Sequence, residues 1–373
     1  MSKYKIMTPG PVQVPENVRL ARSLSTTNAD LDPQFYDEYK ETCELISELL
    51  HTKNETLILS GEGILGLEAA CASMTEPGDR VLILDNGIYG AGFADFVSMY
   101  GGTPVMYTKD YKNAFDVDEL DAYLKEDHDF KYATVVHCDT PSGMLNDIHK
   151  ICPLLKSYGI MTVTDSVSGM FGNEVNVDKA QIDILCGGSQ KAVSAPPGLT
   201  FVTISDEAKK VMENRKTPIA SFYCNLTIFK DYYKNLWFPY TMPISDIYGL
   251  KAAMDNIAAD KDLIKRHARI ANATRKAIEA FGLKLHLESG FSDTVTVFDV
   301  PEGMTADDIL ERMREKHGIM LAGSFGELAG KVIRIGHMGA SANVGDMLEV
   351  MSGLEETLRS VSYTHLTLPT ICS

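Results

Sequence analysis

The sequence predicts an α/β protein with a mainly parallel, seven-stranded sheet in a large domain and a smaller α+β domain after it. Two observations lead to this prediction. From Thr56 to about Ile204, short apolar runs alternate with helix-like runs, and most apolar runs are continuous, as in strands that helices cover on both faces. From Ile244 onward, helical and strand-like segments are mixed without that alternation.

Seven apolar runs are the expected strands of the large sheet, namely residues 56–60, 80–86, 103–108, 132–139, 160–166, 182–188 and 199–205. Helix-like runs separate them at residues 66–74, 89–101, 117–126 and 149–159. Asp116 and Asp118 mark a helix start, and Gly101 and Gly159 follow helix ends. This order predicts parallel strands joined by helices that cross over the sheet.

The C-terminal region begins with a predicted long helix over residues 244–281, which Gly282 ends and which we expect to bridge the two domains. Strands are predicted at residues 283–289, 294–300 and 332–338, and helices at 305–318 and 344–359. We therefore divide the chain into an N-terminal arm (1–15), a large domain (16–250) and a small domain (251–361). Residues 362–373 carry no charged side chain and continue no preceding element, so we interpret them as a non-native tail.

Size and charge limit the possible functions. The 373 residues fit about two domains of roughly 150 residues each. The formal net charge of −16 argues against nucleic acid or an anionic membrane as partner, because both need a basic surface. No apolar run approaches the ~20 residues of a membrane span, and the start has no secretory core. The seven scattered cysteines lack a CxxC pair, so we expect reduced thiols, no metal site and a cytoplasmic location.

Lys191 is the first candidate for chemistry. It follows the apolar strand IDILCGG and lies in GGSQKAVSAPPG, between small residues. A lysine at the carboxyl edge of a sheet can point into a cleft, where desolvation lowers its pKa and frees its amine for Schiff-base formation. A lysine after a strand is, by itself, more often a solvated surface group.

Two further features of the sequence support a functional site that includes Lys191. Asp165 ends the strand in VTDSVSG, 26 positions before Lys191 (191 − 165), where it could face a ring nitrogen or simply cap the next helix. SGEGILGLEAA, residues 60–70, is a glycine-rich turn from a strand into a helix. The backbone N–H groups of such a turn can bind a phosphate, although many similar turns bind nothing.

The motifs HCDTPSG, TDSVSG, SQKAVSAPPG and RIGHMG occur in this order, after TPGPVQVP near the start. Together they resemble the class V aminotransferases of fold type I, in particular the alanine–glyoxylate and serine–pyruvate group, over nearly the whole chain. The resemblance implies a pyridoxal-phosphate enzyme that moves an amino group between an amino acid and a keto acid. It also implies a homodimer with active sites at the interface.

The resemblance implies a role for each matching residue. Lys191 is the Schiff-base lysine that also moves the α-proton, and Asp165 is the partner of the protonated ring nitrogen. The other expected cofactor-binding residues are Gly61, Glu62, Gly63, Tyr89 against the ring face, Thr140 near the ring oxygen, Gln190 and Phe238 near the phosphate, and Thr241, donated across the dimer interface. The expected substrate-binding residues are Arg334 for the carboxylate, with Glu62, Pro9 and Gly10.

Two residues depart from the usual pattern at the phosphate site. Glu62 stands in the glycine-rich turn where many relatives have a small or neutral residue, and Phe238 stands where many have a tyrosine. A carboxylate ~4 Å from a phosphate charge would be repelled by about 4 kcal/mol at an effective dielectric of ~20. The alternative is that Glu62 points away and only favours the helix start.

One branch of the family accepts a ring without phosphate. GEGILGLEAA, IYGAGF, HCDTPSGMLN and FPYT look similar to pyridoxamine–pyruvate aminotransferase, which uses the unphosphorylated vitamer as a substrate. Our hypothesis is that Glu62 binds the hydroxymethyl arm of pyridoxamine and that alanine and pyruvate form the other pair. Phe325 and Ala192 depart from that branch, which has an arginine and a cysteine there, so an ordinary alanine/serine–glyoxylate (pyruvate) aminotransferase stays open.

Other functions fit less well. A desulfurase needs a loop cysteine, and residues 322–330 contain none. A lyase on the same fold would not depend on a keto acid. A binding protein without turnover is the non-enzyme alternative, and the presence of both Lys191 and Asp165 argues against it. The amino donor cannot be deduced from the sequence.

Overall fold

A computed structural model describes residues 4–360; the predicted tail at 362–373 lies outside them. The central sheet has seven strands, as the sequence predicts, and β10 alone runs antiparallel to its neighbours. In sheet order the strands are β2 (Glu55–Ser60), β10 (Leu199–Ile204), β9 (Ile184–Gly188), β8 (Met161–Asp165), β5 (Tyr132–Val136), β3 (Arg80–Asp85) and β4 (Thr103–Thr108). The predicted fold class is thereby confirmed.

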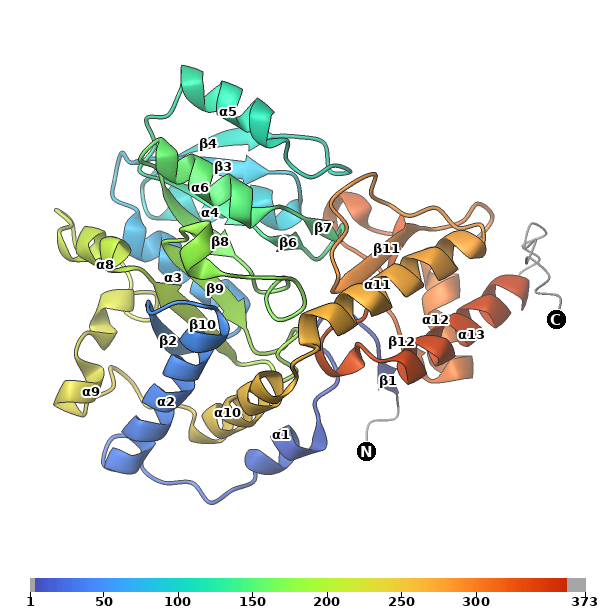
Figure 1. Cartoon of the computed structure of the whole chain (residues 1–373), viewed down its shortest axis with the longest axis horizontal. Coiled ribbons are helices and arrows are strands. Elements are labelled where there is room, and N and C mark those ends of the chain that lie inside the picture. Colours follow the sequence, from blue (N-terminus) through green and yellow to red (C-terminus); the bar gives the residue numbers. More distant parts are fainter. Residues whose placement is uncertain (1–3, 361–373) are drawn as a thin grey trace.

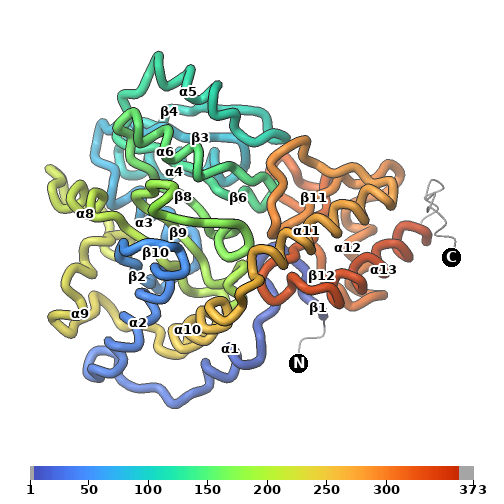
Figure 2. Tube along the Cα trace, viewed as in Figure 1, coloured from blue at the N-terminus to red at the C-terminus, as the bar shows by residue number. Residues whose placement is uncertain are grey.

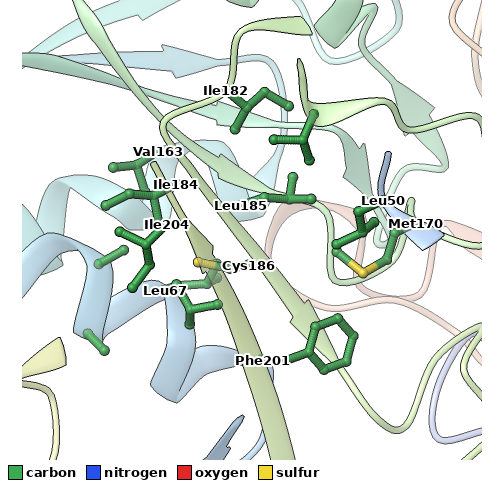
Figure 3. Packing of buried hydrophobic residues seen from close by; sticks show 14 of the residues in the cluster. Leu50, Leu67, Val163, Met170, Ile182, Ile184, Leu185, Cys186, Phe201 and Ile204 are labelled. Atoms are coloured by element: carbon green, nitrogen blue, oxygen red, sulfur yellow. The ribbon is translucent and has the colours of Figure 1, made fainter. Parts of the chain in front are cut away.

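Helices cover both faces of this sheet (Figure 1). On one face, Cys186 of β9 donates its thiol hydrogen to Gly66 of α3, and Leu67 of the same helix lies beside it (Figure 3). On the other face, Cys152 of α6 contacts Thr164 of β8, and Phe201 and Met170 pack together. Side chains of successive strand residues point to opposite faces, so strands covered on both sides are apolar throughout, which explains the continuous runs in the sequence.

The remaining elements of the N-terminal two thirds surround this sheet (Figure 1). They are α1 (Glu16–Ala21), α2 (Pro33–Leu49), α3 (Gly63–Met74), α4 (Ile88–Met99), α5 (Val117–Glu126), β6 (Cys138–Asp139), β7 (Met144–Leu145), α6 (Ile148–Ser157), α7 (Val177–Ala180), α8 (Asp206–Glu213), the 3-10 helix η1 (Leu226–Phe229), α9 (Tyr232–Asn235) and α10 (Ile244–Ala259).

The C-terminal part has its own apolar cluster. Its elements are α11 (Leu263–Ala280), β11 (Val295–Asp299), α12 (Ala306–His317), β12 (Ile319–Met320), η2 (Gly326–Leu328), β13 (Val332–Gly336), η3 (Gly339–Ser341) and α13 (Val344–Ser360). The N-terminal segment joins this part, because β1 (Lys5–Ile6) pairs with β12 and Met7 is buried in the cluster (Figure 2). The predicted boundary at 250/251 falls inside α10, whose buried residues belong to the core of the large sheet; the domain bounds stay a prediction.

Three element predictions were wrong in detail. The long helix over 244–281 is two helices, because the chain leaves helical geometry at Asp260, whose carboxylate pairs with Arg266 of α11. Residues 283–289 form only one isolated bridge, from Leu285 to Phe298, so they are not a strand. The strand at 132–139 ends at Val136, and residues 138–139 pair with β7 instead.

Two properties bear on the expected class of protein. In the part of the chain from 4 to 360, we find no helix that is both long and apolar enough to cross a membrane. The six cysteines in the same range are free and buried.

Candidate active site

The candidate active site is a cavity of about 300 Å³ at one edge of the central sheet. Six of the seven strands point the same way, so the segments that follow β2, β3, β5, β8 and β9 meet at their carboxyl ends. This is where open α/β sheets bind ligands. Eight predicted site residues line the cavity: Gly10, Glu62, Gly63, Tyr89, Thr140, Asp165, Gln190 and Lys191.

Lys191 enters the cavity from the loop after β9. Its Nζ donates hydrogen bonds to the carbonyl of Pro9, at 2.8 Å, and to Thr140 Oγ1, at 3.5 Å. A side chain on Gly10, whose φ is +109°, would come within 2.5–2.8 Å of the Lys191 side chain. Burial lowers the pKa of the lysine to about 8, with Arg334 acting in the same direction. The amine is therefore closer to its reactive neutral form at neutral pH than an ordinary lysine.

Asp165 is the last residue of β8 and is 4% exposed. Its Oδ1 accepts a hydrogen bond from the backbone N–H of Val167 at 2.8 Å, and we find no bond to Oδ2 from residues 4–360. Burial raises the pKa of this carboxyl to about 7, against the opposite effects of Val167 and Lys191. A buried carboxyl group with one open oxygen can hold a protonated ring nitrogen.

Tyr89 begins the first turn of α4 and is held by a buried carboxylate. The backbone N–H of Tyr89 donates to Asp139 Oδ1 at 3.0 Å, while Ser142 donates to Asp139 Oδ2 at 2.6 Å. The carboxyl group of Asp139 fits against Gly87, where any Cβ would approach it within 2.4 Å. The glycine before α4 thus allows Asp139 to fix the tyrosine beside the cavity.

Arg334 lies on β13, next to the cavity but not among the residues that line it. Its Nε donates to the carbonyl of Gly323 at 2.5 Å, and its Nη1 donates to the carbonyl of Thr140 at 3.4 Å. These bonds orient the guanidinium and leave donors on Nη1 and Nη2 for a carboxylate. Thr140 therefore contacts both Lys191 and Arg334.

The glycine-rich turn before α3 already has acceptors for most of its N–H groups. Glu62 is the N-cap of α3, and its Oε1 accepts from the N–H of Ile64 at 3.1 Å. The N–H of Leu65 is bonded to the Glu62 carbonyl, and that of Gly61 to the Gly198 carbonyl. Glu62 Oε2 accepts from Gln190 Nε2 at 3.1 Å, which leaves Gln190 Oε1 buried without a partner. The Glu62 carboxylate thus lies at the position where a phosphate was expected, bonded to Gln190.

Five predicted site residues do not line the cavity of this chain: Arg334, described above, and Gly61, Pro9, Phe238 and Thr241. Gly61 lies just behind the glycine-rich turn, and Pro9 contributes its carbonyl to Lys191. Phe238 is buried and stacks on Tyr36 with ring centroids 4.5 Å apart, and Thr241 is exposed. The proposed cofactor contacts of the last two stay predictions.

The sequence argument missed seven lining residues, namely Pro11, Ile64, Leu67, Cys138, Val167, Ser168 and Pro197. All but Leu67 and Ser168 stand within two positions of a predicted residue or inside the APPG turn, and these two lie within the quoted motifs, so proximity to the motifs was the available signal.

Comparison with known proteins decides the family. A family model described as aminotransferase class-V matches residues 18–337. The chain belongs to the class-V aminotransferases. It is 34% identical to the pyridoxamine–pyruvate transaminase of Mesorhizobium japonicum, over 90% of this chain and 86% of that protein. It is 30% identical to the alanine–glyoxylate aminotransferase of Callithrix jacchus, over 95% and 87%. The crystal structure of ureidoglycine–glyoxylate aminotransferase from Bacillus subtilis superposes with a TM-score of 0.91, at 31% identity, over 96% of this chain and 93% of that one.

This class-V aminotransferase is a transaminase of amino and keto acids, and its family implies a pyridoxal-phosphate-type cofactor. The cavity residues fit the ring of such a group, since an amine, a carboxyl group with one open oxygen and the Tyr89 side chain line the same space. When bound, the ring withdraws electrons from the substrate carbon. Asp165 would keep the ring nitrogen protonated, Tyr89 would restrain the ring face, and Lys191 Nζ would remove and return the proton of the substrate carbon.

The raised pKa of Asp165 predicts a pH-dependent stability of the cofactor-free aminotransferase. Between the ordinary value of 3.8 and about 7, the folded state holds a proton that the unfolded state has released. The free energy of unfolding therefore falls as pH rises through this window, by as much as about 4 kcal/mol. Asp165→Asn removes the fall. Urea unfolding at pH 5 and pH 7.5 measures it, with Asp95→Asn on the exposed face of α4 as control. Equal pH dependence in the wild type and Asp165→Asn would contradict the account.

Proposed function

We propose that this aminotransferase transfers the amino group of pyridoxamine, the phosphate-free vitamer, to pyruvate. The products are pyridoxal and alanine, so the CH₂–NH₂ arm becomes an aldehyde while the keto carbon gains an amino group and a hydrogen. The observation that carries the proposal is the Glu62 carboxylate, which lines the cavity at the glycine-rich turn and accepts a hydrogen bond from Gln190.

The chemistry of these acceptors distinguishes the two B6 forms. A phosphate dianion offers acceptor oxygens and no hydrogen, so it gains nothing from a carboxylate or an amide oxygen and is repelled by the former. A hydroxymethyl group has one O–H to donate, and a carboxylate oxygen of Glu62 can accept it. The amide orientation of Gln190 is fixed because its Nε2 donates to Glu62. The resemblance to pyridoxamine–pyruvate transaminase over 90% of the chain supports the same assignment.

The second candidate is an ordinary pyridoxal-phosphate-dependent alanine/serine–glyoxylate aminotransferase. Phe325 and Ala192 favour it, because the pyridoxamine–pyruvate branch has an arginine and a cysteine at these positions. Relatives of this second type match the chain over similar lengths.

The test measures B6 preference directly. We expect the dialysed wild-type enzyme to convert pyridoxamine and pyruvate without added pyridoxal phosphate. In Glu62→Gln, affinity for pyridoxal phosphate should rise and kcat/KM for pyridoxamine should fall, each about tenfold, which corresponds to about 1.4 kcal/mol. Asp116→Asn, which removes the N-cap carboxylate of α5 far from the cavity, is the matched control. A wild-type enzyme that keeps pyridoxal phosphate through dialysis and does not convert pyridoxamine would overturn the proposal.

We also propose that the enzyme is a homodimer in which Thr241 reaches the partner's site. Large apolar side chains around this segment support it: Phe222 is 57% exposed, Tyr223 52% and Trp237 54%. Such exposure is typical of a surface that another chain covers.

A further inference from the structure

Phe325 lies beside the arginine that is expected to bind the substrate carboxylate. The centroid of its ring is 5.8 Å from Arg334 Cζ. The same ring meets Tyr89 edge to face, with centroids 6.1 Å apart and an interplanar angle of 71°. Phe325 is 43% exposed, so part of its ring contacts these two side chains and part is accessible to solvent.

Hydrogen bonds hold the three residues before Phe325 to Arg334 of β13 and to the turn after β6. Ala322 pairs with Arg334 through two backbone hydrogen bonds, at 2.7 and 3.2 Å, and the Gly323 carbonyl accepts from the Arg334 side chain. Ser324 Oγ donates to the Pro141 carbonyl in the turn after β6, at 3.2 Å. Each of the three residues before Phe325 is therefore bonded, and the ring is held at a defined distance from the guanidinium.

The charges around this position are mostly negative. Burial raises the pKa of Tyr89, and the Asp165, Asp139 and Glu62 carboxylates act in the same direction. Asp165 and Glu62 line the same cavity as Tyr89, and Asp139 accepts a hydrogen bond from its backbone N–H. The cations with the largest effects on the pKa values of Tyr89, Asp139 and Asp165 are Lys191 and Arg334. Lys191 is expected to act in the reaction itself. Arg334 is therefore the cation of this pair that is left to bind a substrate carboxylate. A second substrate carboxylate placed against the Phe325 ring would meet an apolar surface, while Arg334 holds the first one.

We propose that Phe325 is a specificity-determining residue that restricts the enzyme to amino and keto acids with a short, uncharged side chain. The ring forms an apolar wall next to the carboxylate-binding edge of Arg334. It accepts the methyl group of alanine or pyruvate and rejects dicarboxylic acids, whose second carboxylate would be desolvated there without a partner. The inference rests on the aminotransferase activity and on the proposed role of Arg334, and it holds for either B6 form.

The test compares pyruvate with oxaloacetate as amino acceptors in the wild type, Phe325→Leu and Phe325→Arg. We expect wild-type kcat/KM to be about a hundredfold higher for pyruvate, and Phe325→Leu to keep this ratio because the wall stays apolar. Phe325→Arg should lower the ratio by at least about tenfold through a lower KM for oxaloacetate, since it supplies a second guanidinium. Glu327→Gln, in the same loop but lining a separate groove with Tyr111, is the control and should leave the ratio unchanged.

Two further arms make the result independent of the B6 assignment. The comparison is run once with pyridoxamine as donor and once with serine and added pyridoxal phosphate, so failure of one arm alone concerns the cofactor form and not Phe325. Titration calorimetry with the unreactive acids propionate and succinate should show the same preference and its reversal in Phe325→Arg. A wild-type enzyme that accepts oxaloacetate as well as pyruvate, or a Phe325→Arg ratio equal to that of the wild type in both arms, would overturn the proposal.

Discussion

The Lys191→Ala enzyme is expected to lose amine transfer by about a thousandfold or more. Lys191 is the amine that lines the same cavity as Asp165 and Tyr89, and burial lowers its pKa to about 8. Loss of this side chain would remove both the proposed nucleophile that holds the B6 aldehyde and the proposed base that moves the substrate proton, and a positioned base alone contributes about 10²–10⁴-fold. Initial rates with a large excess of pyruvate measure the effect.

The same variant should also lose the covalent attachment of pyridoxal. Borohydride reduction of the wild type in the presence of pyridoxal should leave the vitamer on the peptide that contains Lys191, as mass spectrometry would show. Lys53→Ala, an exposed lysine away from the cavity, should keep both the rate and the attachment. Attachment at another lysine, or an unchanged rate in a folded Lys191→Ala protein, would contradict the role of Lys191.

The second large effect is expected for Asp165→Asn in the loaded enzyme. An asparagine can still accept the Val167 N–H but carries no negative charge to keep the ring nitrogen protonated. Breaking a buried ion pair by removing one partner costs about 3–5 kcal/mol, which at 1.36 kcal/mol per factor of ten lowers kcat roughly a hundredfold to several thousandfold. KM for the keto acid should change little, because Arg334 and not Asp165 is expected to hold its carboxylate.

Asp165→Glu separates a chemical from a structural effect. It restores the carboxyl group one methylene further out, so it should recover part of kcat that Asp165→Asn loses. If Asp165→Asn and Asp165→Glu were equally impaired while both bound pyridoxal as the wild type does, the charge of Asp165 would not be what the reaction requires.

Much of the large domain could be predicted because its strands are buried on both faces. Continuous apolar runs such as 184–188 carry that signal directly, and the helices between them begin and end at residues with known preferences, such as Asp116. The C-terminal part was harder. Residues 283–289 alternate like a strand, but they pair with β11 only at the bridge from Leu285 to Phe298, and the neighbours His286 and Leu287 are both buried.

One predicted helix and one predicted strand also end earlier than the hydrophobic pattern of the sequence indicates. The predicted helix over 244–281 ends at Asp260 because that carboxylate pairs with Arg266 across the break. The strand over 132–139 stops at His137, whose N–H donates to the Asp165 carbonyl before the chain turns to pair with β7. Asp165 is distant from His137 in the sequence, and Arg266 lies within a run of residues that favour a helix. The hydrophobic pattern therefore identifies neither partner.

At the site, motif order predicted which residues meet, and the structure added how they are bonded. Lys191, Asp165, Tyr89 and Thr140 line one cavity, as the resemblance implies. The sequence left open whether Glu62 caps its helix or faces the cavity, and it does both. The position of Phe325 between Tyr89 and Arg334 could not be predicted, because it depends on how a loop of the C-terminal part docks on the turn that follows β6.

The most direct measurement is a crystal structure of the enzyme reduced with borohydride in the presence of pyridoxal. The account predicts electron density that joins Lys191 Nζ to the vitamer, with the ring nitrogen within hydrogen-bond distance of an Asp165 carboxylate oxygen. A ring attached elsewhere, or attached at Lys191 with its nitrogen out of reach of Asp165, would contradict it.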